Sequence, residues 1–374
     1  MKCLREAYFN KVKMIYIDPP YNTGSDFIYR DQFLEKTKEY IINSQQVNES
    51  GNRLFTNLET NGRYHSDWLN MMFPRLKIAR DFLSDDGVIF ISIDDHELAN
   101  LRKICDEIFG ESNFIATLVW ERAYSPKNDA KYISNNHDYI LMFAKNIASF
   151  KIGRLPRTEE ANSRYTNPDN DPRGPWKSSD LSVKTYNAST DYPITTPSGR
   201  IVNPPSGGCW RLTKEAFEER LRDNRIWFGA NGNAVPSIKK FLNELKNEGM
   251  APTSILFYKD VGHSQEGVND LLKVFQTKIF DGPKPLRLIE RLMTLANLND
   301  DSIVLDFFSG SATTAHALLR FNREKEKHCK FICIQIPQEI PEDRNPLDFD
   351  NIAKIGLERI RRVSEDYKKS PCFK

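Results

Sequence analysis

A short turn, DPPYNTG at residues 18–24, combines residue types that can bind a planar amine. It directly follows the apolar run VKMIYI, which predicts a buried strand, so the turn lies at a strand's carboxyl end, where open α/β sheets bind ligands. Pro19 and Pro20 restrict the backbone on both sides of Asp18 and Tyr21. The Asp18 carboxylate and the Pro19 carbonyl are two acceptors beside the Tyr21 ring, on which a base can stack. Such a turn could accept both protons of a nucleobase amino group and withdraw its lone pair from the ring.

A second turn, LDFFSGSATTAHA at residues 305–317, also follows an apolar strand and opens a helix. Gly310 permits close approach of a ligand to the backbone, and residues 311–314 supply hydroxyl groups at the start of the helix. The turn matches neither GxxxxGK nor GxGxxG. Asp306, at the end of the strand, suits a cationic group such as an ammonium better than a phosphate. Either turn alone could be purely structural, whereas their joint occurrence favours a ligand site.

The elements around these turns predict an α/β fold with a mostly parallel sheet, because strand-like and helix-like segments alternate. In residues 1–145 we expect strands at 12–17, 87–93, 114–120 and 138–143 and helices at 68–83 and 95–109. Residues 276–374 continue with the helices KPLRLIERLMTLAN, TTAHALLRF and NIAKIGLERIRRV and the strands SIVLD and KFICIQI. We therefore predict one sheet built from both ends of the chain.

Residues 146–275 differ in composition and predict an inserted domain. They are rich in Pro, Asn, Ser and Gly, and helical periodicity returns only in TKEAFEERLRDN and SIKKFLNELKNEG. Trp176, Trp210 and Trp227 lie among basic residues there, as either DNA-stacking platforms or core residues would. Between Tyr40 and Tyr64 a polar, Asn-rich stretch predicts a long loop.

Composition excludes several classes of protein. With 53 Lys and Arg against 51 Asp and Glu, the net charge of +2 indicates no particular partner, and 39% hydrophobic residues exclude a disordered chain. No apolar run approaches the roughly 18 residues of a membrane span, and the N-terminus lacks a signal peptide's apolar segment. The six cysteines form no CxxC pair, so we expect no metal site, no disulfide framework and a reducing, cytoplasmic location.

The two turns resemble the catalytic and cofactor motifs of DNA amino-methyltransferases, and their order resembles the β class. DPPYNTGSDFIY, WLNMMFPRL, ISIDDHE, HDYILMFAKN, FDGPKPLRLIERLM and DFFSGSATTAHA are most similar to the modification (Mod) subunits of type III restriction systems. The resemblance covers nearly the whole chain. It implies a Rossmann-like, S-adenosylmethionine-dependent methyltransferase fold in circularly permuted order. Residues 1–145 would be its catalytic half, 146–275 a target-recognition insert and 276–374 its cofactor-binding half.

The resemblance also implies the reaction, its partners and the role of each site residue. The substrate would be adenine in double-stranded DNA, and the protein would form a homodimer and pair with a restriction (Res) subunit. Asp18 and the Pro19 carbonyl would hold the target amino group, while Pro20 and Tyr21 pack on a base flipped from the duplex. No metal or covalent intermediate is implied. The expected S-adenosylmethionine-binding residues are Asp306, Phe308, Gly310, Ser311, Thr313, Lys284, Pro285 and Gln335.

Three features depart from the family pattern. Ala312 stands where a second glycine is common, a tolerable change if its φ is negative. Gln335 replaces an acidic residue that binds ribose hydroxyls in many methyltransferases, and it can still form hydrogen bonds. Only 17 residues precede Asp18, whereas family members carry an upstream strand with an acidic turn. A truncated chain with an open sheet edge is therefore expected.

Two alternative functions remain open. The chain could be a catalytically silent DNA-binding or subunit-interaction remnant, or it could methylate cytosine amino groups or RNA.

Two charged segments, IDDHE at 93–97 and ERIRRV at 358–363, are interpreted as a solvated helix N-terminus and a solvated helix face. His328, Cys329 and Cys333 fit no zinc spacing and are expected to be core and edge residues.

Overall fold

The computed structural model describes residues 1–23, 64–128, 130–245, 249–340 and 345–369. The chain forms two compact units, Met1–Gly153 with Pro252–Lys374, and Arg154–Ala251. The second unit lies inside the range 146–275, and α8 (Ser264–Phe275), which also falls in that range, belongs to the first unit. The loop expected between Tyr40 and Tyr64, together with Gly24 and Cys372, lies outside the described residues.

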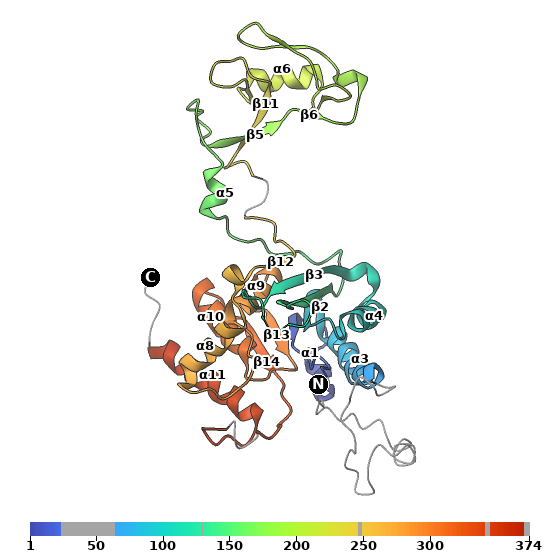
Figure 1. Ribbon diagram of the computed structural model, residues 1–374, viewed down its shortest axis with the longest axis vertical. Coiled ribbons are helices and arrows are strands. Elements are labelled where there is room, and N and C mark those ends of the chain that lie inside the picture. The colour runs from blue at the N-terminus through green and yellow to red at the C-terminus, as the bar shows by residue number, and fades with distance from the viewer. Residues whose placement is uncertain (24–63, 129, 246–248, 341–344, 370–374) are drawn as a thin grey trace. The chain divides into compact units, whose positions relative to one another are not determined.

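The first unit contains a seven-stranded sheet in the order β12-β3-β4-β2-β1-β13-β14 (Figure 1). Its strands are β1 (Val12–Ile17), β2 (Leu83–Ile93), β3 (Phe114–Glu121), β4 (His137–Ala144), β12 (Ile255–Leu256), β13 (Ile303–Asp306) and β14 (Lys330–Cys333). Only β4 runs antiparallel to its neighbours. The sheet is therefore mostly parallel and combines strands from both ends of the chain, which confirms the predicted α/β fold.

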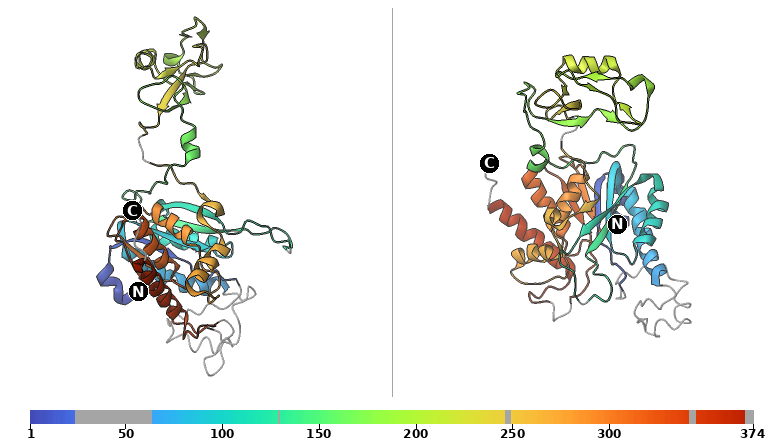
Figure 2. Two further views of the ribbon diagram at one scale, coloured as in Figure 1. Left: turned by 90° about the vertical axis from the view of Figure 1, so that its left-hand side faces the viewer. Right: turned by 45° about the horizontal axis from the view of Figure 1, so that its top comes forward.

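Helices cover both faces of this sheet (Figures 1 and 2). On one face lie α3 (Tyr64–Phe82) and α4 (Leu98–Phe109), and on the other lie α9 (Leu286–Leu295), α10 (Thr313–Lys325) and α11 (Ile352–Lys369). Short helices η1 (Lys2–Leu4), α1 (Arg5–Tyr8), η2 (Glu111–Asn113) and α7 (Tyr258–Val261) complete the described part of the unit. No described helix combines the length and apolar character that a membrane crossing requires.

The central strand β1 is buried along its whole length, as expected for a parallel strand covered on both faces. β1 lies between β2 and β13 and is therefore an interior strand of the sheet. A core cluster joins β1 and β2 to α3 and α4 through fully buried residues that include Ile15, Trp68, Leu76, Ile91 and Leu101. Burial of each such aliphatic side chain stabilises the fold by about 1.5–3 kcal/mol.

The parallel pairing of β1 with β13 places the two turns at the same edge of the sheet. Ile15 lies opposite Leu305 in this pairing, and Asp18 and Phe308, each three residues further on, follow the ends of these adjacent strands. The carboxyl ends of parallel strands meet at one edge, which is the position of ligand sites in open α/β sheets. The turns of Asp18 and Asp306 are thus neighbours in space, although they lie far apart in the sequence.

The second unit is a small domain of short antiparallel strands. It contains a sheet of β10 (Ile226–Trp227), β11 (Ser237–Phe241) and β5 (Trp176–Asp180), and two two-stranded sheets. The two-stranded sheets are β6 (Ser182–Val183) with β9 (Cys209–Trp210), and β7 (Ile194–Thr195) with β8 (Ile201–Val202). The helical segments are α5 (Glu159–Ser163), η3 (Ala188–Thr190) and α6 (Lys214–Arg222), and α6 confirms the helix predicted in TKEAFEERLRDN. Trp176 and Trp210 are buried, which fits core residues.

The helix predicted in SIKKFLNELKNEG is wrong. Residues Ser237–Phe241 form β11, which pairs with β5 and β10. The spacing of Ile238, Phe241 and Leu242 matches a helical period, but Lys239 and Phe241 are the buried positions, two residues apart as in a strand. Lys239 is buried because its ammonium pairs with Asp169 and Asp171, which periodicity counted on apolar residues cannot register.

Candidate functional site

Asp18 lies directly after β1, and each of its two carboxylate oxygens accepts a hydrogen bond. The Tyr21 hydroxyl donates to Oδ1 at 2.9 Å, and the Lys284 ammonium lies 2.5 Å from Oδ2. The Asp18 side chain keeps 29% of its surface exposed, whereas Lys284 keeps 11%. A carboxylate can accept about four hydrogen bonds, so Asp18 retains acceptor capacity toward a ligand.

The rest of the DPPY turn is held by an aromatic side chain from α3. The Trp68 indole donates to the Pro20 carbonyl at 2.7 Å, and Trp68 itself is fully buried. Pro19 is buried, and Tyr21 is half-buried. The turn is therefore a rigid shelf, as its two prolines predict, with Trp68 as an additional anchor.

Lys284, one of the residues expected to bind S-adenosylmethionine, directly contacts the DPPY turn. Its ammonium pairs with Asp18 and lies 5.3 Å from the Tyr21 ring centroid and 5.9 Å from that of Trp120 in β3. Pro285 is buried and caps the start of α9. The segment packs tightly on α8, because a Cβ on Gly267 would lie 1.9 Å from the Pro283 carbonyl oxygen. Lys284 is thus part of the DPPY site.

A second carboxylate, Asp138 at the start of β4, belongs to the same charged group. It is buried, and Arg122 lies 3.0 Å away as an ion-pair partner. Burial raises the pKa of the Asp138 carboxyl to about 6; the charge of Asp18 adds to this rise, and those of Lys284 and Arg122 oppose it. Sequence reasoning missed this residue, although one acidic residue opening the apolar run DYILMF was an available signal. Perturbed carboxylates of this kind are typical of functional sites.

Asp306, at the end of β13, is the buried carboxylate of the second turn. Thr314 Oγ1 donates to its Oδ2 at 2.5 Å, and the Phe308 N–H donates to its Oδ1 at 3.0 Å. Burial raises the pKa of the Asp306 carboxyl to about 7; these two hydrogen bonds oppose the rise, and the charge of Asp18 adds to it. A cationic ligand group would offset the cost of burying this charge, so the site fits an ammonium or sulfonium.

Gly310 adopts a positive φ of 48°, and a Cβ there would lie 3.1 Å from the Phe280 ring. Glycine is needed both for this conformation and for the close approach. The Gly310 N–H donates to Gln335 Oε1 at 2.7 Å, so Gln335, just after β14, is tied to the turn. Phe308 is buried and packs against Phe307. The turn is therefore braced from two sides.

Ala312 occupies the left-handed region with a φ of 59°, so the condition of a negative φ is not met. A non-glycine residue in this region costs about 1–2 kcal/mol. Ser311 and Thr313, on either side, are buried and accept hydrogen bonds from Arg359 of α11. Arg359 is fully buried, so the interpretation of ERIRRV as a solvated face is wrong at this residue. The strained turn is thus enclosed by α11.

Glu97 is also buried, contrary to the solvated helix N-terminus expected for IDDHE. Its Oε1 accepts from Asn22 Nδ2 at 2.5 Å and lies 2.7 Å from His65 Nδ1, while its Oε2 accepts from Asn100 Nδ2 at 2.8 Å. Asn22 directly follows the DPPY shelf. Glu97 therefore ties the shelf to the start of both α3 and α4, a role that the residue type alone did not reveal.

We expect Glu97→Ala to lower the free energy of unfolding by about 1–3 kcal/mol, because the amides of Asn22 and Asn100 would lose a buried acceptor. Urea denaturation measures this loss. Glu107→Ala, on the exposed side of the same helix, is the matched control and should change stability by less than about 0.5 kcal/mol. Equal effects of the two substitutions would contradict the role of Glu97 in holding the shelf.

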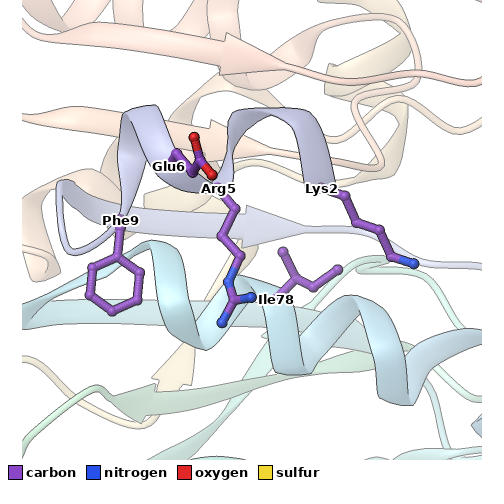
Figure 3. Close-up of a pocket in the computed structure, with 5 residues that line it drawn as sticks. All are labelled: Lys2, Arg5, Glu6, Phe9 and Ile78. Carbon is purple, nitrogen blue, oxygen red and sulfur yellow. The ribbon is translucent and has the colours of Figure 1, made fainter.

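A separate hollow lies at the opposite end of β1, beside α1. Figure 3 shows its lining residues, Lys2, Arg5, Glu6, Phe9 and Ile78. Arg5 pairs with Asp81 at 2.8 Å, and none of the lining residues belongs to either turn. In the described parts of the chain, no group of three or more His, Cys, Asp and Glu side chains is arranged to hold a metal ion.

Comparison with known proteins identifies relatives over most of the chain. Residues 12–344 match the model of a family described as DNA methylase, N6_N4_Mtase. The chain is 34% identical to the StyLTI Mod subunit, a type III restriction-modification enzyme of Salmonella typhimurium, over 97% of this chain and 55% of the relative. It is 31% identical to the EcoP15I Mod subunit of Escherichia coli, over 98% of this chain and 61% of the relative.

A third relative has a different name and a more similar length. The type II methyltransferase M.KpnI of Klebsiella pneumoniae is 29% identical, over 97% of this chain and 84% of the relative. The chain spans only 55% to 61% of the length of the two Mod subunits.

Proposed function

The chain belongs to the DNA methylase family, and on this premise we propose that it transfers a methyl group from S-adenosylmethionine to the exocyclic amino group of adenine in double-stranded DNA. We propose further that it acts as the modification part of a type III restriction system, as its relatives named Mod subunits suggest. The observation that supports this most strongly is the parallel pairing of β1 with β13, which brings the DPPY turn beside the turn of Asp306.

The DPPY shelf would bind the target base. Asp18 and the Pro19 carbonyl would accept the two amino protons, and Tyr21 and Pro20 would pack on the ring of a base extruded from the duplex. Asp18 can accept such a bond while keeping Tyr21 and Lys284 as donors, because the carboxylate has spare lone pairs. Both bonds localise the lone pair on the amino nitrogen and aim it at the neighbouring turn.

The second turn would bind the cofactor. When bound, S-adenosylmethionine supplies a methyl group on a positively charged sulfur. The buried Asp306 carboxylate would attract its cationic groups, and Gly310 would let the backbone approach it closely. The remaining residues proposed to surround it are Phe308, Ser311, Thr313, Lys284, Pro285 and Gln335. Because the methyl carbon passes directly to nitrogen, these residues act by positioning and electrostatics.

The second unit, Arg154–Ala251, would recognise the target sequence. Its basic and amide side chains offer donors and acceptors for phosphates and base edges. By analogy with the Mod subunits it resembles, the chain would act as a homodimer and pair with a restriction subunit. Adenine is proposed rather than cytosine because the catalytic motif begins with Asp18, whereas β-class cytosine enzymes more often begin this motif with Ser.

The test is a methyl-transfer assay with tritiated S-adenosylmethionine and mixed-sequence duplex DNA, followed by separation of the labelled nucleosides. Labelled N6-methyladenine supports the proposal. Labelled N4-methylcytosine would instead identify cytosine as the substrate. A parallel assay with RNA in place of DNA tests the substrate class, and label in RNA but not in DNA would contradict the proposal. Calorimetry with the cofactor covers the case without incorporation, since absence of binding would favour a catalytically silent remnant.

A further inference from the structure

We propose that Arg359 is a positioning residue that holds the cofactor turn in its left-handed conformation at Ala312. This inference rests on the proposed function for its ligand. The geometry behind it is independent of any ligand, because three hydrogen bonds from Arg359 join α11 directly to the turn.

The Arg359 guanidinium contacts both neighbours of Ala312. Its Nη1 donates to the Ser311 carbonyl at 3.1 Å, to Ser311 Oγ at 3.2 Å and to Thr313 Oγ1 at 2.8 Å. Its Nε donates to His316 Nδ1 at 3.1 Å, one turn into α10. One rigid side chain therefore fixes the residue before the strained position, the residue after it and the first turn of the helix that follows.

The neighbouring residue of α11 makes the approach possible. Gly356 lies three residues before Arg359 and so shares its helix face. A Cβ on Gly356 would lie 3.3 Å from both the Ala312 Cβ and the Gly310 carbonyl oxygen. The helix α11 therefore packs directly on the turn at two points, one of them through backbone contact.

Helix stability does not explain why a cation is buried here. A positive charge beside a helix N-terminus opposes the helix dipole of α10, and Nη2 of Arg359 is buried without a hydrogen-bond partner among the described residues. Burial and the Arg359 charge lower the pKa of His316 to about 3, so this histidine is neutral and can accept from Nε. Costly arrangements of this kind persist where they hold a functional conformation.

The test uses four proteins: wild type, R359K, A312G and the double variant. Arg359→Lys keeps a positive charge but cannot reach all four acceptors at once, so we expect the Kd for S-adenosylmethionine to rise about tenfold or more, with the KM for cofactor raised and kcat within about threefold. Ala312→Gly should change the Kd less than twofold. In the double variant most of the affinity should return, because glycine adopts this φ without the Arg359 contacts.

A second readout needs no ligand. We expect R359K to lower the melting temperature of the cofactor-free protein more in the wild-type background than in the A312G background. Arg361→Lys, on the exposed side of the same helix, is the control and should leave both readouts unchanged. If R359K does not fold, Thr313→Val removes one acceptor at nearly the same size and Thr313→Ser keeps it. These two variants are compared by the melting temperature of the cofactor-free protein, because Thr313 is itself proposed to contact the cofactor.

The two proposals fail separately. A wild-type protein that does not bind S-adenosylmethionine contradicts the proposed function, while the melting temperatures still test the contact between Arg359 and the turn. A wild-type Kd in R359K would overturn the positioning role. So would a double variant as weak as R359K, because Arg359 would then act on something other than the conformation of Ala312.

Discussion

Asp18→Ala is expected to lower kcat for methyl transfer by about 10²- to 10³-fold or more, the usual effect of removing a preorganised group that stabilises developing charge. Without this carboxylate, the amino nitrogen keeps its lone pair in the aromatic ring and attacks poorly. Cofactor binding should change less than kcat, because Lys284 alone among the residues proposed to surround the cofactor pairs directly with Asp18. Single-turnover kinetics with tritiated cofactor measure the loss.

Another Lys–Asp pair on β1 provides the control. Lys13, near the start of the strand, lies 2.7 Å from Asp86, so Asp86→Asn breaks a similar pair at the opposite end of the sheet. It should leave kcat within about twofold of wild type. Equal losses in both variants would show that the effect of Asp18 is structural, and wild-type kcat in Asp18→Ala would remove Asp18 from the mechanism.

Tyr21 acts on the same base in a different way. Tyr21→Ala should abolish most activity by removing the stacking ring, worth about 1–3 kcal/mol per base. Tyr21→Phe keeps the ring and loses only the hydrogen bond to Asp18, so it should retain most of the base affinity.

The parts of the fold that follow hydrophobic periodicity could be predicted from sequence. The strands around VKMIYI and SIVLD and the helix α9 coincide with their predicted segments, because their apolar residues alone determine the buried face. The segment Ser237–Phe241 failed because its buried face includes Lys239, whose burial depends on Asp169 and Asp171 from elsewhere in the chain.

The candidate site also contains parts that a local sequence signal predicts and parts that depend on distant elements. Both turns were predicted, because a small-residue turn after an apolar strand is a local signal. The positions of Lys284, Asp138, Glu97 and Arg359 were not, because each takes its partners from distant elements. A charged residue looks equally solvated in a sequence whether its partner is water or a buried carboxylate. Only the packing of α8, α11 and β4 distinguishes the two.

Cofactor affinity is expected to increase about tenfold as the pH rises from 5.5 to 7.0, because Asp306 must ionise to bind a cation. Burial raises the pKa of Asp306 to about 7 in the free protein, so at pH 5.5 nearly all of the population carries a neutral carboxyl. A bound ammonium or sulfonium favours the ionised form, and binding should release close to one proton at pH 6. Below pH 7 the α-amino group of the ligand stays protonated and does not obscure the effect.

Calorimetry in two buffers of different ionisation enthalpy measures the released proton and the Kd together. Asp306→Asn should bind weakly and without this pH dependence, whereas Asp301→Asn, in the exposed turn that precedes the same strand, should behave as wild type. The stability of the free protein gives an independent check of sign. Because the folded pKa is raised, the stability linked to Asp306 is complete below about pH 4 and is lost as the pH rises through about 7. Asp306→Asn should therefore reduce the fall in melting temperature between pH 5 and 8, and an unchanged fall would show that Asp306 is already ionised in the free protein.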